Sequence, residues 1–269
     1  GILKLNVDLA GAVQNGGELS VEASLFDGSN EIFSEVKNTG LEGGKASLDF
    51  SGRFPSVKKW SAETPDLYSL VLTLKDNSGK ILECAGAKIG FRKVEILNSQ
   101  LMVNGVPILL KGTNLHEHHD VTGHVIDEET ILKDIKVMKS NNINAVRTSH
   151  YPQQELWYDM CDRYGLYLID EADIESHGIG YEKDVTLADK PEWAAAHTAR
   201  MLAMVERDKN HPSVIIWSLG NEAGDGHNFL NNYKWTKQRD PSRPVQYERA
   251  EKSTNTTERH TDIVCPMYA

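Results

Sequence analysis

The stretch that decides the fold is Ser213-Val214-Ile215-Ile216-Trp217-Ser218-Leu219-Gly220-Asn221-Glu222. It begins as a continuous apolar run, which is typical of a strand buried on both faces of a parallel sheet. A glycine, an amide and a carboxylate follow at its end. A carboxylate in that place must be paired, hydrogen-bonded or used in chemistry. Two interpretations of Asn221 and Glu222 are open at this point: they cap the next helix, or they belong to a functional site.

The composition limits the class of protein. The 269 residues are 39% hydrophobic and 25% charged, which is ordinary for a globular chain of one large domain or two smaller ones. No apolar run approaches the length of a membrane span. The net charge of -10, without a basic cluster, argues against a nucleic-acid partner.

The three cysteines, Cys84, Cys161 and Cys265, lie far apart, which indicates neither a zinc ribbon nor a disulfide framework. This usage fits a reducing compartment. We therefore expect a cytoplasmic protein, with the periplasm as the alternative. No signal peptide is visible, but the chain has no starting Met and opens on a strand-like pattern, as a segment of a longer protein would.

The first third of the chain alternates apolar and polar residues with a period of two. Turn signals separate these short runs, among them Asn15-Gly16-Gly17, Asp27-Gly28-Ser29-Asn30 and Asp76-Asn77-Ser78-Gly79. Short strands at this spacing predict an immunoglobulin-like β-sandwich over residues 1–95. No catalytic constellation is visible there, so we expect a supporting role.

Residues 96–269 have a different pattern. Asn104-Gly105 between two apolar runs predicts a hairpin. Strands and helices then alternate, which favours a parallel sheet of repeated βα units. No GxGxxG turn follows the first strand, so we favour a (β/α)8 TIM barrel over an open dinucleotide-binding sheet. About six barrel strands fit before Ala269, and an eight-stranded barrel would be incomplete. Helices are expected after Asp127, over 153–163, from Pro191 to about 210, and over 229–238, with the sixth strand at 263–265.

Ionisable and amide side chains follow every predicted barrel strand, at the end where barrel enzymes place their active sites. Each has a structural alternative: the histidines from His116 to His119 as a solvated loop, Arg147 as an ion pair with a buried carboxylate. Glu175-x-His177 is too short a motif to define a metal site by itself. Six strands with polar groups at one end nevertheless favour a pocket. The residues are Asn114, His116, Glu117, His118, His119 and Asp120, then Arg147, Ser149 and His150, then Asp170, Glu171, Asp173, Glu175 and His177, then Asn221, Glu222, Glu248 and Tyr268.

Neither a GxSxG nor an HExxH motif is present, which leaves carboxylates, imidazoles and amides as the chemical groups. Glycoside hydrolysis fits this set. It needs one protonated carboxylic acid and one ionised carboxylate on either side of the scissile bond, with hydrogen-bonding groups for the sugar hydroxyls.

Several motifs resemble the β-galactosidases of the glycoside hydrolase family that also contains the β-glucuronidases. They are Asn114-Leu115-His116-Glu117-His118-His119, Arg147-Thr148-Ser149-His150-Tyr151-Pro152, Asp170-Glu171-Ala172-Asp173-Ile174-Glu175-Ser176-His177-Gly178, Arg207-Asp208-Lys209-Asn210-His211-Pro212-Ser213 running into the opening stretch, and Asp240-Pro241-Ser242-Arg243-Pro244. The match runs from about residue 60 to residue 269 and is looser before it. Glu175-x-His177 and Gly220-Asn221-Glu222 are similar to the galactosidase branch.

The resemblance implies site residues and a cofactor. Glu222 matches the general acid/base, and Asn221 the residue that holds the sugar 2-hydroxyl. His116 and His150 match residues that contact the sugar. Glu175, His177 and Glu222 match the ligands of a Mg²⁺ ion. The implied reaction is retaining hydrolysis of a β-galactoside, in a parent protein that we expect to be a homo-oligomer.

The resemblance also implies what is missing. The nucleophilic glutamate of the family follows the seventh barrel strand, so we expect this chain to carry the acid/base without the nucleophile and to be inactive alone. Glu171 or Glu248 as a replacement is not favoured. The alternatives are a non-catalytic carbohydrate-binding or scaffold fragment, glucuronidase-like specificity, and a magnesium-dependent barrel lyase, which lacks an obvious lysine base at a strand end.

Overall fold

The computed structural model describes residues 1–11, 17–250, 256 and 258–267. Two sequence predictions concern residues outside the described ranges: Asn15 and Gly16 of the predicted turn, and Tyr268. Contacts within the chain divide it into two compact units: residues 1–60 with 66–91, and residues 61–65 with 92–269. Within the described residues, no helix is long and apolar enough to cross a membrane.

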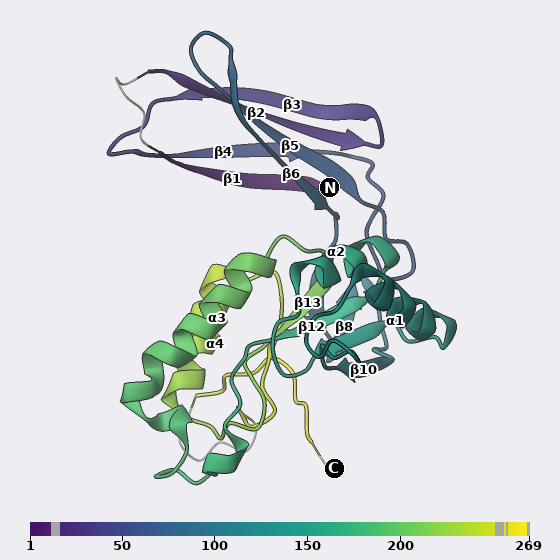
Figure 1. Ribbon diagram of the computed structural model, residues 1–269, viewed down its shortest axis with the longest axis vertical. Helices are drawn as coiled ribbons and strands as arrows, with labels where there is room; N and C mark the ends of the chain where they lie inside the picture. Colours follow the sequence, from purple (N-terminus) through teal and green to yellow (C-terminus); the bar gives the residue numbers. More distant parts are fainter. Residues whose placement is uncertain (12–16, 251–255, 257, 268–269) are drawn as a thin grey trace. The chain divides into compact units, whose positions relative to one another are not determined.

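The first unit is a β-sandwich of two antiparallel sheets. One sheet pairs β1 with β4, and the other has the order β3-β2-β5-β6 (Figure 1). Val7, Val21 and Phe50 pack in one buried cluster that joins strands of both sheets, which is what the period-two alternation predicts. The strands are β1 (Ile2–Ala10), β2 (Leu19–Asp27), β3 (Asn30–Thr39), β4 (Lys45–Arg53), β5 (Tyr68–Lys75) and β6 (Ile81–Ile89).

The sequence analysis missed strand β3. Its apolar residues Ile32 and Phe33 are adjacent, which breaks the alternation. The pairing with β2 accounts for this: Leu25 lies opposite Phe33 and Phe26 lies opposite Glu31, so Ile32 is the extra residue of a bulge in β3. The sandwich itself is observed. Its immunoglobulin-like character stays a prediction.

The second unit opens with a small antiparallel sheet of β7 (Val94–Leu97), β8 (Gln100–Val103) and β9 (Val106–Pro107). Asn104 and Gly105 connect β8 to β9 with positive φ angles of 56° and 80°. Two such residues define the hairpin turn for which Asn-Gly is the favoured sequence, so this prediction is confirmed.

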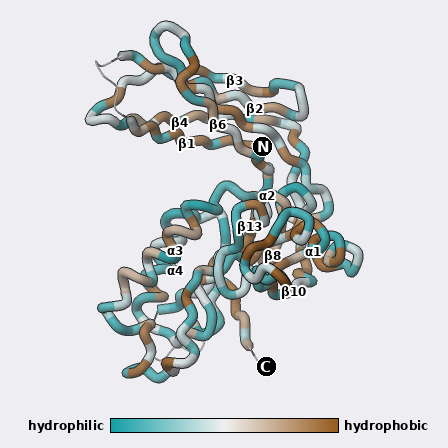
Figure 2. The backbone as a smooth tube through the Cα atoms, in the orientation of Figure 1, coloured by the Kyte–Doolittle hydropathy of each residue, from teal (hydrophilic) through white to brown (hydrophobic). Residues whose placement is uncertain are grey.

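The rest of the second unit is an incomplete α/β barrel. Five parallel strands have the order β10-β11-β12-β13-β14. Figure 2 shows hydrophobic segments near the label of β13, in this sheet, and near the label of β8, in the small antiparallel sheet. A sixth strand was expected at residues 263–265; a single parallel bridge from Gln246 to Ile263 stands in its place. The strands are β10 (Gly112–Leu115), β11 (Ala145–Thr148), β12 (Tyr167–Glu171), β13 (Val214–Ser218) and β14 (Val245–Gln246).

Four α-helices connect these strands, close to the expected positions. The Asp127 side chain accepts a hydrogen bond from the Thr130 backbone N–H, as an N-cap does. Gly165 ends the second helix in the left-handed conformation, at φ 78°. Pro191 begins a 3-10 turn that leads into the third helix. The helices are α1 (Glu128–Ser140), α2 (Glu155–Tyr164), α3 (Ala194–Asp208) and α4 (His227–Arg239).

The strand of the opening stretch is the centre of this unit. Every residue of β12 and β13 is buried, which agrees with a continuous apolar run in a parallel sheet. The strands pair in a register that sets Glu171 beside Ser218 and Ser218 beside Gln246. Their carboxyl ends therefore meet at one edge, and the residues after each strand gather there.

Candidate active site

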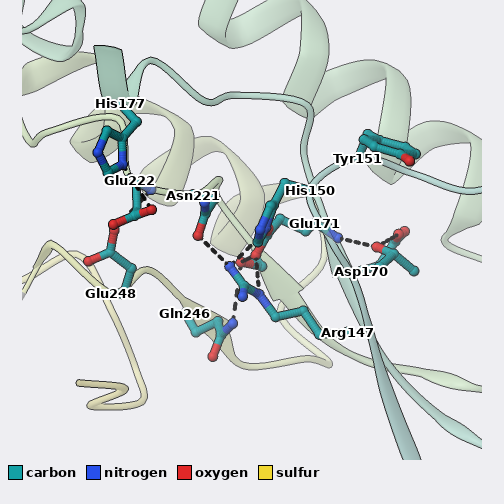
Figure 3. A network of polar contacts seen from close by, with 12 residues as sticks. Arg147, His150, Tyr151, Asp170, Glu171, His177, Asn221, Glu222, Gln246 and Glu248 are labelled. Atoms are coloured by element: carbon teal, nitrogen blue, oxygen red, sulfur yellow. Dashed lines mark hydrogen bonds and ion pairs between the residues drawn. The ribbon is translucent and has the colours of Figure 1, made fainter. Parts of the chain in front are cut away.

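The first group of polar side chains at this edge centres on Glu171, whose carboxylate is fully buried. Arg147 from β11 donates to both of its oxygens, at 2.6 and 3.0 Å. His150 Nδ1 lies 2.7 Å from Oε1, and the Ser218 hydroxyl donates to Oε2 at 2.7 Å. Figure 3 shows Arg147 between Glu171 and Asn221. A buried carboxylate held by this many contacts acts as an anchor for the residues around it.

The anchor fixes two of the predicted sugar-binding residues. Arg147 Nη2 also donates to Asn221 Oδ1 at 2.8 Å, and Asn221 is 1% exposed. The Asn221 backbone N–H donates to the Ile174 carbonyl oxygen at 2.9 Å. His150 packs edge to face against His116, with ring centroids 5.4 Å apart. His116, His150 and Asn221 thus belong to one connected group, and Arg147 is the structural ion pair that the sequence left as an alternative.

The second group surrounds Glu222. Its Oε2 lies 3.0 Å from His177 Nδ1, and its Oε1 lies 3.3 Å from the Tyr181 hydroxyl. Its backbone N–H donates to Glu248 Oε1 at 3.0 Å, and Figure 3 shows His177 and Glu248 beside Glu222. Burial raises the pKa of Tyr181, and the Glu222 charge adds to this, so the phenol keeps its proton at neutral pH. Burial also raises the pKa of Glu248, with a further rise from Glu222.

The backbone brings Glu222 to this position through an unusual turn. Gly220 has φ 152°, and a Cβ there would lie 2.6 Å from the Ile174 carbonyl oxygen, so only glycine fits. Glu222 itself has φ 39°, a left-handed conformation that is uncommon for a residue with a side chain. Helix α4 begins at His227 after Gly226, so Glu222 is not its cap. A strained conformation of this kind is typical of functional positions.

The predicted magnesium ligands come together only in part. His177 and Glu222 are hydrogen-bonded, but the exposed Glu175 does not join them. Among the described residues, the trio of ligand atoms found within 4.8 Å of one another is a different one. It comprises Asp159, Asp162 and His211, where Asp162 accepts from the Ser213 backbone and pairs with His211. As arranged, Glu175, His177 and Glu222 do not fit a magnesium site, so no step proposed below uses the ion, and magnesium stays a prediction.

Other strand-end residues lie away from both groups or act locally. Asp170 points into the unit, where it accepts from Tyr158 at 2.6 Å, and burial raises its pKa well above the usual value. Glu117 accepts from the Gln154 backbone N–H, and His119 accepts from two backbone N–H groups of its own loop. The solvated-loop alternative therefore holds for His119. Asn114 and Asp120 are exposed.

Two residues of the second group were missed by the sequence analysis: Tyr181 and Arg249. Arg249 follows Glu248 directly after β14, so extending the strand-end rule by one residue would have found it. Tyr181 lies four residues after His177 in a long loop, and no periodic pattern marks it.

Comparison with known proteins agrees with this geometry. Residues 94–269 match the model described as "Glycosyl hydrolases family 2, TIM barrel domain", and residues 1–92 match "Glycosyl hydrolases family 2". The chain belongs to glycosyl hydrolases family 2. Its sandwich and its incomplete barrel are thus the successive domains of that family.

Curated proteins named beta-galactosidase are similar to this chain in sequence. One from Vibrio cholerae serotype O1 and one from Alteromonas mediterranea are each 48% identical to it, over 93% of this chain and 24% of their own length. This chain thus spans about a quarter of these relatives. A solved β-D-glucuronidase from Dictyoglomus thermophilum has a TM-score of 0.76 at 28% identity, over 94% of this chain and 43% of that one. A Bacteroides uniformis β-glucuronidase, at 20% identity and TM-score 0.81, shares the fold.

Proposed function

We propose that this chain carries the acid/base half of a retaining β-galactosidase, with Glu222 as the general acid/base. The observation that carries the proposal is the position of Glu222: a carboxylate on a left-handed backbone at a strand end, beside an Asn221 that Arg147 holds fixed. Beta-galactosidases 48% identical to this chain support the choice of substrate.

In the proposed reaction, protonated Glu222 donates its proton to the oxygen of the leaving group. In the second half, the ionised carboxylate takes a proton from the attacking water. Tyr181 and His177 hold the two carboxylate oxygens, which limits rotation of the group that moves the proton. Asn221 would hold the sugar 2-hydroxyl, and His116 and His150 would contact the sugar. These roles rest on the family resemblance and on the grouping described above.

The attacking nucleophile is assigned to neither neighbouring carboxylate. Glu171 is buried behind Arg147, His150 and Ser218, with its oxygens already bonded. Glu248 accepts from the Glu222 backbone with one oxygen, and its other oxygen lies 3.1 Å from Arg249 Nε, so both oxygens are engaged. We therefore propose that the nucleophile comes from the rest of the parent polypeptide, and that residues 1–269 alone do not turn over a nitrophenyl galactoside. The cytoplasmic location and the homo-oligomeric parent remain proposals of the same kind.

Glu222→Gln in the full-length protein tests the acid/base role. Without the acid, aglycones that leave poorly should depart 10²–10⁴-fold more slowly, as expected for general acid catalysis, whereas acidic phenols should be much less affected. Glu206→Gln on the surface of α3 is the matched control. Equal losses on both classes of aglycone would remove Glu222 from the acid role. Comparing a nitrophenyl galactoside with the glucuronide separates galactosidase from glucuronidase specificity.

A further inference from the structure

Arg249 occupies a defined place beside the acid/base candidate. Its Nη2 lies 3.7 Å from Glu222 Oε1, and its Nε lies 3.1 Å from Glu248 Oε2. Its guanidinium carbon lies 3.9 Å from the centre of the Tyr181 ring. The side chain is 25% exposed. These contacts are ion pairs and a cation–π contact, and together they place the charge of the guanidinium beside Glu222.

Arg249 lies where it can offset the repulsion between the Glu222 and Glu248 carboxylates. The bond from the Glu222 N–H to Glu248 Oε1 draws the Glu248 carboxylate next to Glu222. Two neighbouring carboxylate charges repel each other unless a cation lies close to both. Arg249 is such a cation, and it is part of the chain. Tyr181 contacts both residues, because its ring packs against Arg249 and its hydroxyl lies near Glu222.

The same position bears on metal binding. A divalent ion on Glu222 would sit close to the guanidinium and be repelled by it, and Glu175 is not in place to strengthen such a site. Arg249 and a divalent ion are therefore competitors for one carboxylate.

We propose that Arg249, stacked on Tyr181, is a positioning residue that acts on the Glu222 carboxylate through its charge and supplies the positive charge that the family resemblance assigns to a metal ion. The proposal rests on the acid/base role of Glu222. Arg249 acts through Glu222 and touches no reacting atom.

Binding of Mn²⁺ to the full-length protein gives a test that needs no activity. Arg249→Met should raise the affinity for Mn²⁺ at least about tenfold, by calorimetry or by the electron paramagnetic resonance signal of the free ion, because the competing cation is gone. Tyr181→Ala leaves the arginine but removes its support, so a smaller gain is expected. Arg239→Met, in an exposed pair with Glu206 at the end of α4, is the control and should change nothing. Equal Mn²⁺ affinity in Arg249→Met and the control would overturn the proposal.

Kinetics of the same variants supply the second readout. Arg249→Met should lower kcat for poor leaving groups at least about tenfold with little change in KM, and Arg249→Lys should recover part of this, since it keeps the charge but not the fork. Added Mg²⁺ should help Arg249→Met more than the unmodified enzyme. If Glu222→Gln shows its leaving-group dependence while Arg249→Met behaves as the control, this inference fails and the proposed function stands. If Glu222→Gln shows none, the proposed function fails first.

Discussion

Arg147→Met is the substitution that tests the anchor most directly. It removes three hydrogen bonds at once: two to Glu171, at 2.6 and 3.0 Å, and one to Asn221, at 2.8 Å. The Glu171 carboxylate has no exposed surface and would keep its contacts with His150 and Ser218. Methionine fills similar volume without charge, so the loss is electrostatic.

The expected cost is about 3–5 kcal/mol, because removing one partner of a buried ion pair leaves an uncompensated charge. That is a large part of the roughly 5–15 kcal/mol by which domains are stable. Glu171→Gln leaves a partly exposed arginine that still bonds Asn221, so it should cost less, about 1–3 kcal/mol. The double variant should be more stable than the sum of the single losses predicts, by about 2 kcal/mol.

Urea denaturation followed by tryptophan fluorescence measures these differences. Four of the five tryptophans, Trp157, Trp193, Trp217 and Trp235, lie in the barrel unit, so the signal reports mainly on that unit. Arg200→Met is the matched control: Arg200 is exposed and donates to the Ala196 carbonyl of its own helix, so its effect should stay within about 0.5 kcal/mol. A cost below about 1 kcal/mol for Arg147→Met, or strict additivity in the double variant, would refute the view of Arg147 and Glu171 as a buried ion pair that anchors this edge of the sheet.

Three further variants test the barrel unit by the same denaturation assay. Burial raises the pKa of Asp240, but Arg243 and further hydrogen bonds lower it to about 2 overall. The stability that Asp240 contributes is therefore present above the unfolded pKa of about 3.9 and is lost as pH falls towards 2. Asp240→Asn should reduce the free energy of unfolding by about 2 kcal/mol at neutral pH and weaken its dependence on pH below about 4. Burial lowers the pKa of His211, but its contact with Asp162 raises the pKa overall. The stability gained from protonated His211 is full below about pH 6.5 and is lost as pH rises through the raised pKa. His211→Asn should therefore reduce the free energy of unfolding more at about pH 5.5 than at about pH 8.5, and an equal loss at both would contradict an ion pair with Asp162. Gly220→Ala should cost at least about 2 kcal/mol, since φ is 152° and its Cβ would meet a carbonyl oxygen at 2.6 Å; a neutral effect would show that the turn can relax.

Periodicity predicted the fold well where each element buries one kind of surface. The run from Val214 to Trp217 is a fully buried strand, and the Asn104-Gly105 hairpin and the Asp127 cap follow from local chemistry. The method failed where a longer-range interaction decides the structure. A bulge within β3 interrupts its alternation, and the predicted strand near Ile263 is reduced to one bridge.

Within the candidate site, sequence reasoning identified the ends of the strands but not the direction of each side chain. His177 and Glu222 were expected to meet and do so, whereas the expected grouping of Glu175 with them is not found among the described residues. Alternation does not separate Glu175 from His177, because positions two apart in an extended chain point to the same side. Arg249 and Tyr181 could be found only from the fold, since their contact joins segments 68 residues apart.

Two carboxylates at the same edge of the sheet, Glu171 and Glu222, show why the position of a residue at a strand end does not decide its role. Glu171 is held by donors on both oxygens and has no exposed surface, so water and substrate cannot exchange protons with it. Glu222 keeps 9% exposure, and its two oxygens meet a tyrosine hydroxyl and an imidazole, groups that can rearrange when a proton moves. A carboxylate that cycles between acid and base needs access and adaptable partners. The partners therefore separate the anchor from the acid/base, and the anchor is what keeps Asn221 beside the group that reacts.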